Sequence, residues 1–501
     1  MTWNAIAPLA VLASSLLTGL VIFFLAEQRH GLRTALNLGG AVVKLAIVVA
    51  MLWGVWHGES YELRFALLAG VDFVLRSDSL AMLFVTLSAL LWLCTTLYAV
   101  GYLEGSPHRS RFFGFFSLCV ASTVGIALAG NLITFVFFYE MLTLTTYPLV
   151  VHRGTEKALR AGNVYLAYTL GGGTLLLAGT AWLYGLLGTV DFAYGGVVAP
   201  IVASHPGALL AIFALLVAGL GVKAGLVPLH TWLPIAMVAP APVSALLHAV
   251  AVVKAGAFGI VRVLYDVYGI ETAADLGLLG PLAIIAAVTI LYGSLRALTQ
   301  VELKRRLAYS TVSQVSYIVL GACVFGPLGT IGGTVHLVHQ GIMKITLFFC
   351  AGNLAETLGV HRVDELDGAG RRMPWTMGAF TLAALGMIGL PPLAGFVTKW
   401  YLGVGAATAG MHWVIAVLMA SSVLNAAYFL PLIYATWFKT RRGPWREQMG
   451  GREQTRFETD WRLLFPPLVT AAFALGAGAL AAAPFSPLSW ATLFAAREYL
   501  R

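Results

Sequence analysis

Apolar runs of about 20 residues recur from one end to the other of this 501-residue chain. An α-helix of that length crosses a hydrocarbon layer of roughly 30 Å. Hydrophobic residues make up 59% of the sequence and charged residues only 11%, whereas soluble globular proteins carry about 25% charged residues. The sequence therefore predicts an integral membrane protein that crosses the bilayer many times.

We count fourteen such segments, and each is expected to form a transmembrane helix. Their approximate bounds are 5–25, 35–56, 78–103, 112–129, 131–151, 161–187, 208–234, 238–264, 276–297, 308–326, 330–355, 374–401, 411–438 and 463–483. The first segment follows no Lys or Arg and ends without a cleavage-site pattern, so we expect it to remain as a helix. The expected fold class is an all-α polytopic membrane protein.

Basic residues in the loops predict the orientation of these helices. Lys and Arg cluster after segments 1, 3, 5, 9, 11 and 13 and are sparse in the alternate loops, except after segment 2. Cytoplasmic loops carry this excess, so both termini are expected on the non-cytoplasmic side of the cell membrane. The net charge of +9 then reflects orientation, and no nucleic-acid partner is expected. The polar stretch 441–460 is expected to be a cytoplasmic loop that contacts lipid headgroups or a neighbouring subunit.

Lysines differ from arginines in where they lie. Of eight lysines, five fall inside apolar segments, whereas the 23 arginines cluster in loops and at segment ends; these five are Lys44, Lys223, Lys254, Lys344 and Lys399. A buried lysine can lose its proton, whereas arginine stays charged. Since a charge at the bilayer centre costs roughly 2.5–3.5 kcal/mol, this placement indicates groups that load and unload protons. Lys44 is the weakest member, because it could instead snorkel or fill a packing gap.

Glu140 is the only acidic residue well inside an apolar run. It could brace a neighbouring helix, or it could pair with one of the buried lysines. A nearby carboxylate favours the charged form of a lysine, and its withdrawal favours loss of the proton. The second interpretation makes Glu140 a candidate gate for proton transfer.

Prolines interrupt two of the segments beside a lysine. Pro228 follows Lys223 in segment 7, and Pro391 and Pro392 precede Lys399 in segment 12. Broken helices at membrane depth occur where the freed backbone is covered by protein or lines water. Segments 7 and 12 run in opposite directions, which predicts two inverted five-helix repeats. The order of proline and lysine is reversed between them, which simple duplication does not explain.

The chain is therefore divided into four expected parts. Residues 1–111 hold helices 1–3, residues 112–264 the first repeat, residues 265–440 the second repeat, and residues 441–501 the polar loop with helix 14.

Histidines accompany the lysines. His248 precedes Lys254 by six residues, and His336 shares a helical face with Lys344. Histidine titrates near neutrality and can relay protons, although a single histidine is more often a hydrogen-bonded core residue. His339, Gln340 and His230 are weaker candidates.

Five stretches carry a resemblance to a known family. They are "FYEMLTLTTYPLV", "GVKAGLVPLHTWLPIAMVAPAPVSALLHAVAVVKAG", "HLVHQGIMKITLFFCAGNL", "DELDGAGRRMPWTM" and "GLPPLAGFVTKW". Over roughly residues 75–440 the chain resembles the antiporter-like, proton-conducting subunits of respiratory complex I, membrane-bound hydrogenases and Mrp-type multisubunit Na⁺/H⁺ antiporters. The resemblance implies fourteen transmembrane helices with two inverted five-helix repeats.

The resemblance also implies roles for five residues. Glu140 and Lys223 resemble the family's ion pair between helices 5 and 7. Lys254 resembles the lysine that links this half-channel to the central axis, Lys344 the central lysine of helix 11, and Lys399 the terminal lysine of helix 12. Protons would then pass from Lys223 and Lys254 by His248 and His336 to Lys344 and leave past Lys399.

Within the family, the lysine in helix 12, the "GAGRRMPWTM" stretch and the absence of a long lateral helix look most like the D subunit of Mrp antiporters. The implied partners are the other membrane subunits of a hetero-oligomeric complex, the bilayer, protons and Na⁺. One feature departs from the family pattern: a second histidine is common four residues after His336, and here that position is Gln340, with His339 one residue earlier. The resemblance therefore does not extend to the second histidine.

Two other classes of function stay open. A proton-pumping subunit of a redox-driven complex would share the mechanism, and broken helices with midplane charges also build transporters of organic solutes or enzymes of lipid-linked substrates. The four cysteines lie in apolar segments without C-x-x-C spacing, and no nucleotide motif is visible. We therefore expect no metal site, no cofactor and no enzyme activity of the chain alone.

Overall fold

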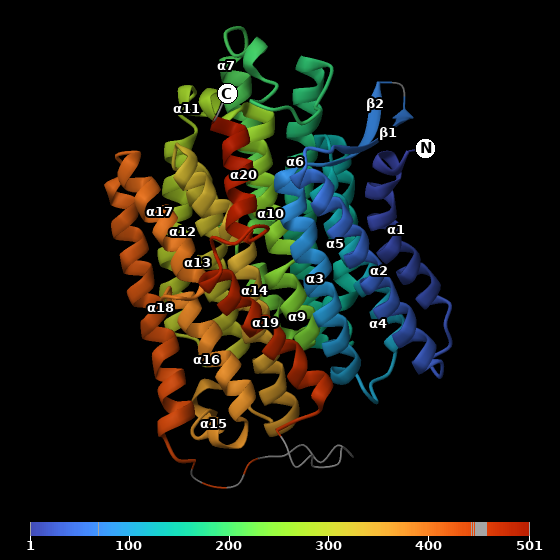
Figure 1. Ribbon diagram of the computed structural model, residues 1–501, viewed down its shortest axis with the longest axis vertical. Coiled ribbons are helices and arrows are strands. Elements are labelled where there is room, and N and C mark those ends of the chain that lie inside the picture. Colours follow the sequence, from blue (N-terminus) through green and yellow to red (C-terminus); the bar gives the residue numbers. More distant parts are fainter. Residues whose placement is uncertain (1, 69, 442, 444, 446–457, 500–501) are drawn as a thin grey trace.

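The computed structural model describes residues 2–68, 70–441, 443, 445 and 458–499. Long helices stand side by side along the longest axis of the molecule (Figure 1). Eleven helical stretches in the described part of the chain are long and apolar enough to cross a membrane. Each of the fourteen predicted segments coincides with one helix or with a pair of helices that a break separates. Most of the polar stretch 441–460 lies outside the described residues, so its predicted contacts do as well.

The elements of the first half alternate between the two ends of the bundle. They are α1 (Trp3–Phe23), α2 (His30–Trp56), β1 (Tyr61–Leu68), β2 (Val71–Ser77), α3 (Ser79–Tyr102), α4 (Arg109–Leu128), α5 (Leu132–Val150), α6 (Glu156–Leu187), η1 (Ala199–Ile201), α7 (Pro206–Ala224), α8 (Trp232–Ile235), η2 (Ala236–Val238), α9 (Ala241–Ala249) and α10 (Val252–Arg262).

The second half continues from η3 (Val263–Tyr268), a π-helical turn, and α11 (Ile270–Asp275). The remaining elements are α12 (Leu279–Leu298), α13 (Leu303–Cys323), α14 (Pro327–Leu358), η4 (Val363–Glu365), α15 (Ala369–Arg372), α16 (Pro374–Ile388), α17 (Ala394–Thr408), α18 (His412–Phe438), α19 (Trp461–Ala479) and α20 (Pro487–Tyr499).

Both predicted helix breaks are present. α7 ends at Ala224, and Pro228 lies in the loop that leads to α8; α16 ends at Ile388, and Pro391 and Pro392 lie in the loop before α17. A third break, which the sequence did not predict, separates α9 from α10 at Val250. The chain thus has a helix end inside the bundle at three places.

An antiparallel hairpin of β1 and β2 adds to the predicted all-α class. Its register pairs Tyr61 with Ser77 and Phe65 with Phe73, with an irregularity between Ala66 and Leu68. We call the end of the bundle that carries this hairpin the hairpin end, and α1 begins and α20 ends there (Figure 1). The loops between α1 and α2, between α3 and α4, and after α18 lie at the opposite end, here called the basic end.

This arrangement matches the predicted alternation of basic loops. The start of α1 and the end of α20 lie at the same end of the bundle (Figure 1). Which side of the membrane each end faces stays a prediction, and so do the inverted repeats and the four-part division.

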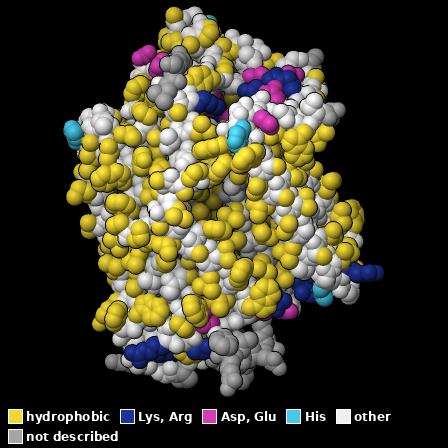
Figure 2. Space-filling model, in the orientation of Figure 1, with side chains coloured by type: hydrophobic (Ala, Val, Ile, Leu, Met, Phe, Trp, Pro, Cys, Tyr) yellow, Lys and Arg dark blue, Asp and Glu magenta, His cyan; other side chains and the backbone are white. Residues whose placement is uncertain are grey.

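α14 is the core helix of the second half. It is buried along most of its length and packs against α3, α9, α13, α16, α17, α19 and α20. Hydrophobic side chains cover the middle of the face in Figure 2, whereas charged side chains gather toward both ends. This distribution is the one expected of a surface that faces lipid.

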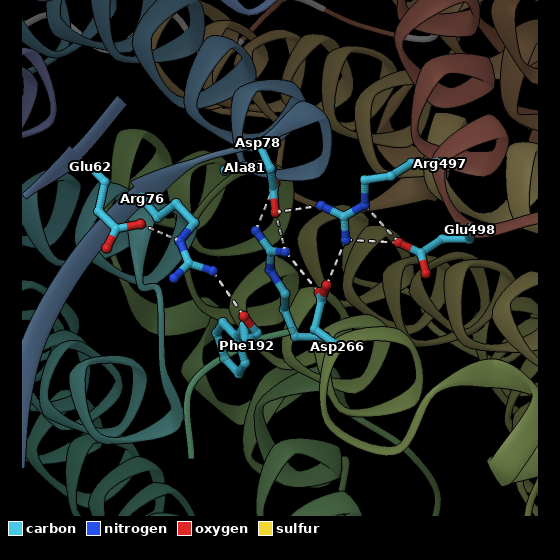
Figure 3. Close-up of polar contacts among 9 residues, drawn as sticks. Glu62, Arg76, Asp78, Ala81, Phe192, Asp266, Arg497 and Glu498 are labelled. Atoms are coloured by element: carbon cyan, nitrogen blue, oxygen red, sulfur yellow. Dashed lines mark hydrogen bonds and ion pairs between the residues drawn. The ribbon is translucent and has the colours of Figure 1, made fainter. Parts of the chain in front are cut away.

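A buried charged cluster fixes α20 at the hairpin end (Figure 3). Arg262 of α10 donates hydrogen bonds to Asp78 at 2.6 and 2.9 Å and to Asp266 at 2.7 Å. Arg497 of α20 donates to the same two carboxylates at 3.1 and 2.6 Å. Burial alone would raise the pKa of Asp78, but the guanidinium groups of Arg262 and Arg497 hold it well below its ordinary value. Asp78 therefore stays ionised between the two cations.

Candidate functional site

Lys223 lies in the last turn of α7, directly before the first break. Its side chain is fully buried, its ammonium donates to the carbonyl oxygen of Tyr139 on α5, and it lies 3.4 Å from the centroid of the Tyr139 ring. Glu140 follows Tyr139 and has one carboxylate oxygen that is buried without a hydrogen-bond partner in the described part of the chain. The structure brings the two predicted partners to the same α5–α7 contact without joining them in a direct ion pair.

Lys254 lies in the first turn of α10, just past the third break, and His248 lies in the last turn of α9, just before it. Both are fully buried. The His248 ring lies 4.7 Å from the Phe348 ring, but neither of its nitrogens nor the ammonium of Lys254 has a partner among the described residues. One unpaired titratable group therefore lies on each side of this backbone interruption.

Two glycines let the neighbouring helices approach this break. A methyl group at Gly256 of α10 would collide with the backbone of α7 around Lys223. A methyl group at Gly341 of α14 would lie 2.8 Å from the carbonyl oxygen of Ala249. These close contacts bring the ends of α7 and α9 and the middle of α14 together at one depth.

α13 and α14 face one another with polar side chains. His336, Gln340 and Lys344 lie on one face of α14, and the facing side of α13 carries Ser310, Gln314 and Tyr317. The Tyr317 ring is 5.2 Å from the His336 ring and 5.8 Å from the Lys399 ammonium. In the described structure both nitrogens of His336 and both polar atoms of Gln340 lack partners.

A continuous set of hydrogen bonds connects Lys344 toward Lys399. Lys344 Nζ donates to Ser310 Oγ at 2.5 Å, and the Tyr428 hydroxyl of α18 lies 3.1 Å from the same oxygen. Tyr428 O–H also donates to Asn425 Oδ1, and Asn425 Nδ2 donates to the Met387 carbonyl oxygen at 3.2 Å. That carbonyl belongs to the broken end of α16, where Lys399 also lies.

Lys399 reaches back from α17 to the end of α16. Its Nζ donates to the Ile388 carbonyl oxygen at 2.6 Å and to Ser422 Oγ at 2.7 Å. The last carbonyl groups of a helix lack intrahelical partners and carry partial negative charge, so they stabilise a cation. Gly389, with φ of 97°, leaves the room that the lysine stem needs.

This contact explains the reversed order of proline and lysine in the two broken helices. Lys223 precedes its break and lies at the C-terminal end of α7. Lys399 follows its break, but its side chain returns to the C-terminal end of α16. Both ammonium groups are thus placed where an interrupted helix ends.

His339 contacts the helix that carries Lys399. Its Nδ1 lies 3.0 Å from the hydroxyl of Thr398 on α17, and its other nitrogen is unpartnered in the described structure. Gln340, one residue later, makes no hydrogen bond to the described residues. The second histidine of α14, His339, therefore lies one position before the expected one and contacts α17.

His230 lies apart from this chain of groups. It is buried in the loop after α7, with its ring 5.0 Å from the Tyr292 ring and 6.2 Å from the Tyr309 ring. At the start of α8, Trp232 Nε1 donates to the Val222 carbonyl oxygen at 2.8 Å, and Thr289 Oγ1 of α12 accepts from the backbone N–H of Val227 in the loop at 3.0 Å. The region around Pro228 is thus held by its neighbours rather than frayed.

Several residues of the site were not predicted. They are Tyr139, Ser310, Gln314, Tyr317, Thr398, Ser422, Asn425 and Tyr428. Ser310, Gln314 and Tyr317 recur at helical spacing in the "LAYSTVSQVSYIV" part of segment 10, so a polar stripe on that helix was the available signal. No such signal marks Tyr428 or Asn425.

Comparisons with known proteins place the residues of the site, except Tyr428, inside a shared region. Residues 129–425 match the family described as "NADH:quinone oxidoreductase/Mrp antiporter, TM". Residues 68–113 match "NADH-Ubiquinone oxidoreductase (complex I), chain 5 N-terminus".

Individual relatives come from more than one kind of complex. The chain is 38% identical to the N subunit of the NADH-quinone oxidoreductase of Desulforudis audaxviator, over 80% of each protein. It is 28% identical to the D subunit of the Na⁺/H⁺ antiporter of Alkalihalophilus pseudofirmus, again over 80% of each. A chain in the structure of the Mrp complex from Dietzia sp. DQ12-45-1b superimposes with a TM-score of 0.86 and 26% identity, covering 100% of this chain and 98% of that one.

Proposed function

The chain belongs to the NADH:quinone oxidoreductase/Mrp antiporter transmembrane family, and on this premise we propose that it is the proton-translocating subunit of a multisubunit Na⁺/H⁺ antiporter. Protons move along buried lysines and histidines near mid-membrane. The partners are the other membrane subunits of the complex, and the location is the cell membrane with the basic end toward the cytoplasm.

The observation that carries the proposal is the hydrogen-bonded connection from Lys344 to Lys399. Ser310, Tyr428 and Asn425 carry hydrogen bonds from the buried Lys344 ammonium to the Met387 carbonyl oxygen, and the half-buried Lys399 donates to the same oxygen at 3.5 Å. The hydroxyls of Ser310 and Tyr428 can pass a proton on because each is both donor and acceptor. The Asn425 amide and the Met387 carbonyl cannot, so in our proposal ordered water carries the proton over the last step to Lys399. A purely structural lysine would need no such connection to a second lysine.

The stretch from Lys223 to Lys344 is bridged differently. Lys254, His248, His336 and Gln340 are buried and present polar atoms without partners among the described residues. Buried polar atoms are ordinarily paired with protein or ordered water, since leaving them unpaired costs about 1–3 kcal/mol each. Ordered water between these four side chains completes the path in our proposal.

Glu140 controls the loading of this path. With the Glu140 carboxylate outside ion-pair distance, the Lys223 ammonium is bound, among the described residues, by the Tyr139 carbonyl oxygen and ring. Closing the distance would stabilise the charged lysine, and opening it would favour proton transfer toward Lys254. The present arrangement of Glu140 and Lys223 corresponds to the open state of that switch.

A second candidate is a proton-pumping subunit of a redox-driven complex. The 38% identity to an N subunit of NADH-quinone oxidoreductase favours it. The side chains of the proton path are compatible with either source of energy, so the partner subunits decide between the two functions. In neither case does the chain carry out a chemical reaction alone.

The test is purification of the tagged protein from its native membrane in mild detergent, with mass spectrometry of the co-purifying subunits. Small hydrophobic subunits with a larger homologue and without iron–sulfur proteins support the antiporter. Sodium-dependent proton flux is then measured in vesicles that contain the complex, with a deletion strain as the control. Iron–sulfur subunits in the complex would overturn the antiporter in favour of the redox-driven function.

A further inference from the structure

Lys44 is a buried lysine outside the proposed path. It lies on α2 and is 0% exposed, so it does not snorkel to either membrane surface. Its Nζ donates to Ser15 Oγ of α1 at 2.6 Å and lies 4.6 Å from the centroid of the Trp92 ring on α3. The lysine is therefore held inside the N-terminal helices by a hydroxyl and an aromatic face.

The surroundings of Lys44 provide no opposite charge. An ammonium has three donors, and Ser15 accepts one of them. The neighbouring helices α1, α3 and α4 contain no Asp or Glu, and the next charged residue on its own helix, Arg33, is three turns away. Trp92 Nε1 and, one turn to either side, the hydroxyls of Ser88 and Thr96 lack partners in the described part of the chain. The site thus has more hydrogen-bonding capacity than the neighbouring side chains use.

Polar side chains lie on the buried face of α2 between the basic end and this lysine, in a line that Ala41 interrupts. Arg33, Asn37, Ala41 and Lys44 form the buried face of the first half of α2. Asn37 Nδ2 donates to the Arg33 carbonyl oxygen at 3.1 Å, and Ser117 of α4 donates to Asn37 Oδ1 at 3.2 Å.

Thr18 of α1 faces α2 at Gly40, between the positions of Asn37 and Lys44. A methyl group at Gly40 of α2 would collide with the Thr18 hydroxyl, so the glycine allows this hydroxyl to reach the interface. Thr18 Oγ1 donates to the Ser14 carbonyl oxygen at 2.6 Å, one residue before Ser15. Beyond Lys44 the buried face of α2 continues with Val48 and Met51, and ten residues on it reaches Gly54, which packs against the Tyr61 hydroxyl and the Glu59 carboxylate. The two turns next to the lysine are thus apolar on that side.

Titratable groups surround the start of this line. Glu27 accepts from the backbone N–H groups of Ser110 and Arg109 at 2.9 and 3.0 Å and lies 3.7 Å from Arg33. Burial raises the pKa of Glu27, but these N–H groups and the Arg33 charge outweigh it and lower the pKa. The ionised carboxylate balances Arg33. His30 lies beside it, with Nδ1 2.9 Å from an Arg33 nitrogen.

We infer that Lys44 is a proton-binding site separate from the lysines of α7 to α17, and that it exchanges its proton with solvent at the basic end by way of Asn37 and Thr18. On release, the ammonium gives one proton to water in this line and becomes a neutral amine that Ser15 can still hydrogen-bond. The inference rests on the proposed function only where its test uses proton flux.

Access from one side is tested first, without any transport measurement. Lys44→Cys is made in a chain whose four native cysteines are replaced by Ala, within the assembled complex, and Ag⁺ is added to vesicles of either orientation. We expect Ag⁺ to block later maleimide labelling only from the basic end, and Asn37→Leu to slow the block by on the order of tenfold. Val48→Cys, one turn beyond, is the unreactive control. An introduced thiol that is unreactive from both sides, or reactive from both, would overturn the inference.

Proton binding is then separated from a structural role by two substitutions. Lys44→Arg keeps the charge and cannot release it, whereas Lys44→Met removes it. We expect proton flux in both variants to depend less on the pH at the basic end than it does in the wild type. We also expect the fluxes of the two variants to differ from each other by at least about twofold. A structural lysine predicts that Arg restores the wild-type profile. Lys344→Met is the control. Absence of proton flux in the wild type would refute the proposed function. Wild-type flux in both Lys44 variants, together with loss of flux in Lys344→Met, would refute only this inference.

Discussion

Lys399 Nζ lies 2.6 Å from the carbonyl oxygen of Ile388, the residue that ends α16, although the two residues are on opposite sides of a helix break. The ammonium therefore caps the helix that precedes its own. In the proposed path the same ammonium is the last proton carrier. A proton cannot leave Lys399 without weakening the contact that holds the two halves of this broken helix together.

Substitution of Lys399 separates these two roles. Lys399→Met removes the cap and the proton carrier, so we expect proton flux to fall on the order of tenfold and the unfolding free energy to fall by about 1 kcal/mol. Lys399→Arg can still donate to the Ile388 carbonyl but cannot release a proton, so flux falls without the loss of stability. Vesicle flux and thermal unfolding of the complex measure the two effects. Normal flux in Lys399→Arg would exclude Lys399 as a carrier.

Tyr428→Phe tests the connection between Lys344 and Lys399. The substitution keeps the ring and removes the hydroxyl that contacts Ser310 and Asn425, so we expect flux to fall roughly fivefold in a normally assembled complex. Tyr434→Phe, on the same helix but 56% exposed, is the matched control and should leave flux unchanged. Equal flux in both variants would mean that protons bypass Tyr428.

Glu140→Gln tests the gate. The amide has the shape of the carboxylate but cannot attract the Lys223 ammonium as an anion does, so we expect flux below about a tenth of wild type. Glu156→Gln is the control, because Glu156 is 79% exposed in its pair with Arg160 and exposed pairs contribute little. The folded complex is verified by size-exclusion chromatography. Full flux in Glu140→Gln would remove Glu140 from the mechanism.

Asp78→Asn tests the charged cluster that holds α20. Without this carboxylate, the buried guanidinium of Arg262 loses one of its two carboxyl partners and Arg497 loses one of its three. Breaking a buried ion pair from one side costs about 3–5 kcal/mol, and we expect a loss of that order in thermal unfolding. Asp191→Asn, whose partner Arg64 is 36% exposed, should cost less than about 1 kcal/mol. Comparable losses in both variants would contradict a special role for the cluster.

Glu498, next to Arg497, predicts a pH dependence of stability. α20 is not one of the apolar spans, and burial raises the pKa of Glu498 from 4.5 to about 7 despite the opposing charge of Arg497. Between these two values the folded protein binds a proton that the unfolded chain has lost. The stabilisation is therefore complete below pH 4.5 and is lost as the pH rises through 7. Melting temperatures across this pH range should show the decline, and Glu498→Gln should flatten it; an equal slope in the variant would assign the effect to another group.

Much of this architecture follows from sequence because the bilayer imposes it. Helix length, lysines inside apolar segments and prolines beside them identified the spans and two of the three breaks. The third break has neither proline nor glycine at Val250 and Ala251; tertiary packing around Gly256 and Gly341 produces it, so no local pattern indicates it. The β1–β2 segment has the alternating residue pattern of strands and a glycine at its turn, but we considered only helices there.

The site was predicted as a set of titratable residues, not as a connected structure. Lysines and histidines are conspicuous in apolar segments, whereas Ser310, Asn425 and Tyr428 are ordinary in such helices. Their importance comes from contacts between α13, α16 and α18, which are distant in sequence. The Glu140–Lys223 pair shows the converse limit, because sequence and resemblance suggest partners and only coordinates show that the ammonium is bound to the Tyr139 carbonyl instead.

The charged cluster at the hairpin end also bears on biogenesis. Asp78, Arg262 and Arg497 are far apart in the sequence, so the ribosome makes the last of them long after the first two are in the membrane. Until α20 docks, Asp78 and Asp266 share a single guanidinium. The ion pairs of Arg497 therefore form only where α3 and α10 are adjacent, so the docking of α20 depends on the correct placement of both helices.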